Sequence, residues 1–164
     1  MRLLFEQGNL IKKLKELISI HTVGDYIYMY PPRQAYQRIE PTEAFELAKK
    51  SIDKFSSINL YYHVPFCKQL CSFCNLYTKV SKNENERSEY VKLLIKETEM
   101  YKPHLVNKKI NTIYIGGGTP SLLAPNDISL LFSYLKNQDI AEVNNIPEVA
   151  IEVAPDTVEY EKFT

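Results

Sequence analysis

All three cysteines of this 164-residue chain lie on one short stretch, at Cys67, Cys71 and Cys74. Their spacing is C-x3-C-x2-C, and the stretch directly follows an apolar, aromatic run. Among metals, thiolates select zinc or iron–sulfur clusters. Three thiolates can hold three corners of a four-iron cluster and leave the fourth iron open, whereas ordinary ferredoxin-type ligation uses four cysteines. Because an open iron can bind a substrate or cofactor, the spacing favours a cluster that performs chemistry.

A structural zinc site is the principal alternative for the same thiols. Such a site usually has a second pair of ligands some distance away in the sequence. Here only His63 is near enough to complete a Cys3His site. Three buried structural thiols are a weaker alternative, because unligated cysteines rarely cluster at such spacings. An odd set of cysteines is also a poor disulfide framework, and in a reducing compartment it indicates a metal site.

Two further groups of residues could bind a ligand. Gly116, Gly117 and Gly118 precede Thr119, and the absence of Cβ atoms lets such a backbone approach a ligand closely or adopt positive φ. A plain strand-to-helix turn is the alternative; the Gly-Lys-Ser/Thr ending of a P-loop is absent. Glu152 ends an apolar strand, where an unpaired carboxylate is costly and a ligand or cation would offset the cost. An exposed strand end is the alternative for Glu152.

The elements that position these residues alternate along the chain. Residues 58–64, 110–115 and 147–153 have the composition of strands, and residues 86–101 and 126–136 have helical periodicity, with Pro103 just beyond the first helix. This alternation predicts βαβ units, a parallel sheet and right-handed crossovers. Ligands of such folds sit at the carboxyl ends of the strands. The three groups of residues should therefore converge on one rim.

Residues 1–57 form a predicted helical extension. Residues 1–20 have apolar side chains at helical spacing, residues 26–33 form an irregular arm, and a helix over 42–55 begins at Thr42 as its N-cap. Three strands do not close a barrel, which needs roughly 250 residues. We therefore expect the chain to be the N-terminal part of a larger protein. The alternative is that residues 1–56 or a partner cover the open edge of the sheet.

Composition narrows the range of partners. The formal net charge is zero, so there is no overall field to attract nucleic acid or an anionic membrane. No apolar stretch approaches the roughly 20 residues of a membrane span, and the N-terminus lacks the cleavage site of a signal peptide. These features predict a cytoplasmic protein that binds no nucleic acid.

The motifs together resemble the radical S-adenosylmethionine (SAM) superfamily. C-x3-C-x2-C with Phe73 before the last cysteine is similar to its cluster motif. The wider segments resemble the branch that holds the oxygen-independent coproporphyrinogen III oxidases and the related heme chaperone. These segments are Tyr61-x-His63-x-Pro65-Phe66-Cys67, Gly116-Gly-Gly-Thr-Pro-Ser and Glu152-Val-Ala-Pro155.

The resemblance implies roles for single residues. Cys67, Cys71 and Cys74 would each bind one iron of a [4Fe–4S] cluster, and the fourth iron would chelate SAM. Gly117, Gly118 and Thr119 would contact the methionine group of SAM, with Gly116 in the same segment. Tyr61, His63, Phe73 and Glu152 would lie near the cluster or SAM. A core aromatic, a satisfied core histidine and a loop-filling phenylalanine are the ordinary alternatives for Tyr61, His63 and Phe73.

The resemblance also implies a fold and an activity. Residues 58–164 would form part of a TIM-type βα barrel, incomplete in this chain and inactive alone. An electron from a donor such as flavodoxin or ferredoxin would cleave SAM to a 5′-deoxyadenosyl radical. An oxidoreductase of heme biosynthesis that decarboxylates a porphyrinogen is the leading expectation. A heme chaperone, a methyltransferase and a heme-cleaving enzyme are alternatives in the same branch, because Asn75 and Ala154 depart from the motifs of the typical oxidases or the chaperone.

Overall fold

The structure is a computed structural model that describes residues 37–74, 76–140 and 145–157. Of these, residues 39–72, 76–140 and 145–157 make up one compact unit, and residues 37–38 and 73–74 are assigned to a second unit. The helix predicted within residues 1–20 and the arm at 26–33 lie outside the described residues. All of the sheet and its helices belong to the first unit.

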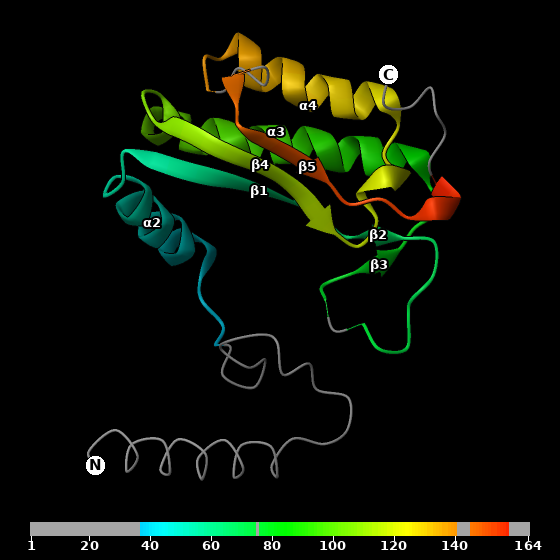
Figure 1. Ribbon diagram of the computed structural model, residues 1–164. Coiled ribbons are helices and arrows are strands. Elements are labelled where there is room, and N and C mark those ends of the chain that lie inside the picture. The colour runs from blue at the N-terminus through cyan, green and yellow to red at the C-terminus, as the bar shows by residue number, and fades with distance from the viewer. Residues whose placement is uncertain (1–36, 75, 141–144, 158–164) are drawn as a thin grey trace, which may run out of the picture. The chain divides into compact units, whose positions relative to one another are not determined.

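Three parallel strands form the sheet of this unit. They are β1 (Ser57–Val64), β4 (Lys109–Gly117) and β5 (Glu148–Ile151), in the order β1-β4-β5. Helices α3 (Glu84–Leu105) and α4 (Pro125–Asn137) are the crossovers and cover one face of the sheet (Figure 1). The predicted α/β alternation is confirmed. β4 runs through Gly116 and Gly117, which were expected to follow the strand, and β5 ends two residues before the predicted end.

The core lies between the sheet and helices α3 and α4. Side chains alternate between the two faces of a strand, so Ile113 and Ile115 are buried while Tyr114 between them is exposed. Tyr61 and Tyr62 on β1 divide in the same way. The core consists of Tyr62, Val64, Phe66, Val91, Leu94, Leu105, Ile110, Ile113, Ile115, Leu123, Leu131, Leu135 and Ile140.

Two predicted helix ends are wrong. Helix α2 (Pro41–Ile52) has Glu40 rather than Thr42 at its N-cap, because Pro41 occupies the first helical position, where its fixed φ fits and its missing N–H costs nothing. Pro103 lies inside α3 instead of beyond it. A proline in the last turn removes a single hydrogen bond, and burial of the following Leu105, only 3% exposed, stabilises that turn.

A short pair of parallel strands closes the cysteine loop. β2 (Phe66–Cys67) pairs with β3 (Lys79–Val80), and Ser81 N–H donates to the Cys67 carbonyl at 3.2 Å. Two-residue strands have no periodicity that a sequence can display, so this pair was not predicted. Two 3-10 helices, η2 (Pro120–Leu122) and η4 (Pro155–Thr157), follow β4 and β5. In the described part of the chain, no helix is long and apolar enough to cross a membrane.

Candidate functional site

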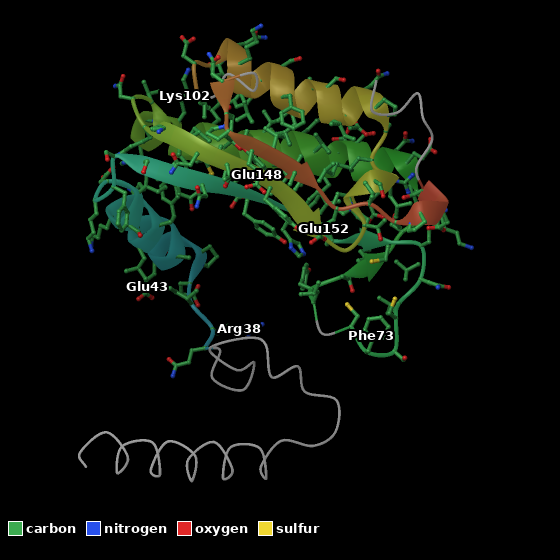
Figure 2. The ribbon with its side chains drawn as sticks, viewed as in Figure 1. Arg38, Glu43, Phe73, Lys102, Glu148 and Glu152 are labelled. Carbon is green, nitrogen blue, oxygen red and sulfur yellow. The ribbon has the colours of Figure 1, made fainter. Side chains whose placement is uncertain are left out.

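The candidate site lies at the carboxyl ends of the three strands. His63 and Val64 at the end of β1 pair in register with Gly116 and Gly117 at the end of β4, and Glu152 follows β5 directly (Figure 2). Each strand thus contributes one of the predicted groups to the same rim. The expected convergence of Cys67, the glycines and Glu152 is confirmed by the contacts described next.

The Glu152 carboxylate is held by two donors. Its Oε1 accepts a hydrogen bond from the Tyr114 hydroxyl at 2.7 Å, and its Oε2 accepts one from the Gly117 N–H at 3.0 Å. The Glu152 N–H donates to the Ile115 carbonyl at 2.9 Å and so extends the sheet by one bond. The bond to the carboxylate raises the pKa of Tyr114, because ionisation would break the bond and place two negative charges together.

Gly117 and Gly118 pack so closely against neighbouring protein atoms that a Cβ would not fit. A Cβ on Gly117 would meet the His63 ring at 2.8 Å and the Val64 carbonyl at 2.9 Å, and its φ of +121° disfavours any other residue. A Cβ on Gly118 would lie 2.8 Å from Cys67 Sγ. Close packing thus requires glycine whether or not a ligand is bound. The glycine segment thus contacts the Cys67 thiol at Gly118 and the Glu152 carboxylate at Gly117.

His63 connects β1 with the returning arm of the cysteine loop. Its Nε2 lies 2.8 Å from the Tyr77 carbonyl and its Nδ1 lies 3.1 Å from the Tyr61 hydroxyl. A carbonyl only accepts, so Nε2 carries the hydrogen and Nδ1 of the neutral ring accepts from Tyr61. Both nitrogens are therefore occupied. A Cys3His zinc site through Nδ1 would give up the bond to Tyr61 and keep the bond from Nε2 to Tyr77, so these contacts do not separate zinc from a cluster.

Tyr61 is not in the core. It lies on the face of the sheet opposite α3 and α4, which we call the open face. It is 58% exposed, and its ring stacks on that of Tyr114 with the centroids 6.0 Å apart and the planes 19° apart. Partial burial, followed by the negative charge of Glu152, raises the pKa of Tyr61. The alternative of a core aromatic is therefore wrong for Tyr61; the buried aromatic of this pair is the adjacent Tyr62.

All three cysteines are free thiols. Cys67 is half-buried, whereas Cys71 and Cys74 are exposed. The loop is anchored near its start by Lys68, whose Nζ donates to the backbone carbonyl and to the carboxylate of Asp156, both at 2.9 Å. Among the described residues, no three His, Cys, Asp or Glu side chains are grouped closely enough to hold a metal ion. The fit to a cluster therefore rests on the chemistry of the donors, which are three thiols on one loop.

The remaining predicted residues take ordinary positions. Thr119 is the N-cap of η2 without a side-chain cap, and Phe73 is exposed. Ala154, which lacks the polar side chain of the related motif, donates its N–H to Ser121 Oγ at 3.1 Å and accepts at its carbonyl from Thr157 Oγ1 at 2.8 Å. These contacts of the Ala154 backbone with the Ser121 and Thr157 side chains fix the chain just after β5.

Tyr114 is the site residue that the sequence analysis missed. It follows from the two-residue period of a strand, because Tyr114 precedes Gly116 on the same face and pairs in register with Tyr61. The signal was available once the register was known. The sequence alone does not show which tyrosines of neighbouring strands lie side by side.

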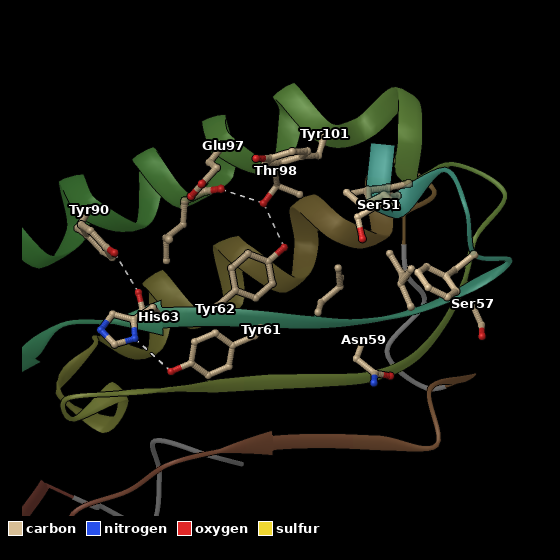
Figure 3. A pocket seen from close by; sticks show the side chains of 16 residues that line it. Ser51, Ser57, Asn59, Tyr61, Tyr62, His63, Tyr90, Glu97, Thr98 and Tyr101 are labelled. Carbon is tan, nitrogen blue, oxygen red and sulfur yellow. Dashed lines mark hydrogen bonds between the residues drawn. The ribbon is translucent and has the colours of Figure 1, made fainter. Parts of the chain in front are cut away.

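A separate cavity of about 620 Å³ runs along the free edge of β1, between α2 and α3 (Figure 3). Its walls are mainly apolar and aromatic, and inside it the Tyr62 hydroxyl lies 3.1 Å from Thr98 Oγ1. It meets the candidate site only through Tyr61 and His63, whose carbonyl accepts from the Tyr90 hydroxyl at 3.0 Å. Cys67, Gly117 and Glu152 are not among its lining residues.

Comparison with known proteins assigns this arrangement to a family. The model of the family described as "Radical SAM superfamily" matches residues 61–163. The chain is 40% identical over 106 residues to the heme chaperone HemW of Buchnera aphidicola subsp. Acyrthosiphon pisum, covering 65% of this chain and 28% of the relative. It is 29% identical over 142 residues to the oxygen-independent coproporphyrinogen III oxidase of Salmonella typhimurium, covering 84% and 31%.

A solved structure supports the fold. The coproporphyrinogen III oxidase of Escherichia coli matches with a TM-score of 0.60 at 23% identity, over 87% of this chain and 31% of that one. The prediction of three parallel strands and helices that form part of a TIM-like barrel is thereby confirmed. The chain spans about three tenths of the length of these relatives.

Proposed function

This chain belongs to the radical SAM superfamily, in the branch of the heme chaperones and oxygen-independent coproporphyrinogen III oxidases, and we propose that it is the part of a radical enzyme that binds the cluster and SAM. The observation that carries the proposal is the packing of the glycine segment. Gly118 packs beside the Cys67 thiol, and the Gly117 N–H donates to the Glu152 carboxylate. A proposed metal ligand and a proposed amine acceptor thus contact the same short segment.

Cys67, Cys71 and Cys74 would each hold one iron of a [4Fe–4S] cluster. When bound, the reduced cluster and SAM together supply a 5′-deoxyadenosyl radical that abstracts hydrogen from a substrate. The protein contributes binding and orientation. The contacts of His63 to Tyr61 and Tyr77 would hold the cysteine loop against β1.

Glu152 and the glycine segment would bind the amino-acid part of SAM. A carboxylate has about four lone-pair sites, and Tyr114 and Gly117 use one on each oxygen. The remaining sites can accept from an ammonium group. The backbone of Gly118 and Thr119 would lie beside the same group, and Tyr61 and Phe73 would contact the cluster or the adenosyl part.

Reconstitution of the full-length protein with iron and sulfide under anaerobic conditions tests the metal assignment. We expect broad charge-transfer absorbance and about four irons per chain, in line with a four-iron cluster. The alternative metal makes a different prediction, namely one tightly bound zinc and no such absorbance. That result would overturn the radical SAM proposal for this chain.

For the substrate, we propose an oxidase-like decarboxylation of a porphyrinogen, supported by the similarity to the coproporphyrinogen III oxidases over 84% of the chain. A heme chaperone is the second candidate, because the identities of 36% and 40% are to heme chaperones. Incubation of the reconstituted, reduced protein with coproporphyrinogen III and SAM separates the two. Vinyl product supports the oxidase, whereas stoichiometric heme binding without product supports the chaperone.

A further inference from the structure

The Tyr114 hydroxyl is the only side-chain donor to Glu152 in the described part of the chain. It lies at the open face of β4, while the flanking Ile113 and Ile115 are buried. Tyr114 remains 39% exposed and does not belong to the core. Its well-defined interactions are the 2.7 Å bond to Oε1 and the stack on Tyr61.

The rings of Tyr114 and Tyr61 and the carboxylate of Glu152 all pack around Gly116. A Cβ at Gly116 would lie 2.7 Å from Tyr114 Cε1, 3.1 Å from Tyr61 Cε2 and 3.2 Å from Glu152 Cδ. The two rings and the carboxylate therefore close over the glycine. Rotation of the Glu152 carboxylate toward solvent would break the bond to Tyr114 and the bond to Gly117 N–H at once.

We infer that Tyr114 is a positioning residue, which holds the Glu152 carboxylate in the orientation that receives the ammonium group of SAM. This inference rests on the proposed function. The Tyr114 bond fixes Oε1 and the Gly117 bond fixes Oε2, so the free lone pairs point in a fixed direction before the ligand arrives. Preorganisation of this kind increases affinity by removing the cost of ordering the acceptor on binding.

The test is a double-mutant cycle on the full-length, cluster-loaded protein, with SAM affinity measured by calorimetry. Tyr114→Phe keeps the ring and the stack on Tyr61 and removes only the hydroxyl. We expect it to weaken SAM binding about tenfold, equivalent to about 1.4 kcal/mol. In a Glu152→Ala background the same change should alter the affinity less than about twofold, since a residue that acts through Glu152 has nothing left to position.

Two controls distinguish positioning from damage to the fold. Tyr134→Phe removes a buried hydroxyl that has no hydrogen-bond partner among the described residues, and it should leave SAM affinity unchanged. The second control is 5′-methylthioadenosine, which lacks the amino and carboxylate groups of SAM. Its affinity should be equal in wild type and Tyr114→Phe.

An unchanged SAM affinity in Tyr114→Phe would overturn the inference while leaving the proposed function standing. An equal loss in the wild-type and Glu152→Ala backgrounds, or a loss of 5′-methylthioadenosine binding, would also overturn it, because Tyr114 would then act elsewhere. If the cluster-loaded wild type binds no SAM at all, the proposed function fails, and the inference fails with it.

Discussion

The two faces of the sheet use the same strands for different purposes. Toward the helices, Ile113 and Ile115 are packed in a continuous apolar core. On the opposite face, Tyr61, Tyr114 and Glu152 form hydrogen bonds and a ring stack at the carboxyl end of the strands. Neighbouring residues therefore differ in role. Changes on the helix-covered face should reduce stability, and changes on the open face should reduce ligand binding.

Loss of a thiol should have the largest effect on cofactor binding. Cys71→Ala removes one of the three proposed iron ligands, so we expect no stable cluster after anaerobic reconstitution, measured as absorbance and bound iron. The exposed neighbour Ser72→Ala is the matched control and should load normally. A cluster of wild-type occupancy in Cys71→Ala would remove that residue from the ligand set.

A core substitution should have the largest effect on stability. Ile113 is fully buried, so Ile113→Ala should lower the free energy of unfolding by about 2–5 kcal/mol through lost burial and a cavity. Urea denaturation of the apo protein measures this change in the free energy of unfolding. Tyr114→Phe, one residue along the strand, should cost far less in the same experiment. Similar losses for the two would contradict the division between the faces.

Gly117 is buried, yet its N–H donates to Glu152, so a change there should affect both stability and ligand binding. Gly117→Ala should destabilise the protein by about 1–3 kcal/mol, because its positive φ is unfavourable for alanine. Its Cβ would also displace His63 or the Val64 carbonyl. Thermal unfolding of the apo protein should show the loss without any cofactor. Wild-type stability would mean that the strand end relaxes readily and that glycine is needed there only for a ligand.

The titration of Tyr114 tests the open-face network in the absence of a cofactor. The hydrogen bond to Glu152 is the main cause of the raised pKa of Tyr114. The bond is therefore present below that pKa and is lost as the pH rises through it. Glu152→Gln should lower the pKa of Tyr114 toward the ordinary value. NMR of ring-labelled tyrosine, assigned with Tyr114→Phe, reports it. An unshifted titration would contradict the bond.

The smallest expected effect on stability is from loss of the contact between Lys68 and Asp156, which anchors the cysteine loop. The Lys68 ammonium lowers the pKa of Asp156, so their interaction stabilises the fold above the ordinary pKa of an aspartate and is lost as the pH falls through the lowered value. Asp156→Asn should therefore be slightly less stable than wild type near neutral pH and equal to it in acid. A difference that persists in acid would have another origin.

The sequence predicts the strands and the parallel sheet, but it does not predict the short β2–β3 pair or the end of α3. The strands at 58–64 and 110–115 are rich in β-branched and aromatic residues, and their alternation with helices predicted a parallel sheet. The pairing of Phe66–Cys67 with Lys79–Val80 depends on loop closure, which no local pattern displays. Pro103 inside α3 shows tertiary burial overriding a local stop signal.

The same limit applies to the site. Cysteines, glycines and Glu152 were identified by residue type and spacing. Tyr114 was missed because a tyrosine in a strand is ordinary until the register places it beside Tyr61 and Glu152. The hydrogen bonds at both His63 nitrogens likewise needed the structure.

Formation of 5′-deoxyadenosine tests the central claim most directly. The reconstituted full-length protein is reduced with dithionite in the presence of SAM, and the products are separated by chromatography. We predict 5′-deoxyadenosine and methionine from wild type, much less from Glu152→Gln, and none from Cys71→Ala. A protein that carries the cluster and is fully reduced, yet forms no 5′-deoxyadenosine, would contradict the assignment of the open face to radical SAM chemistry.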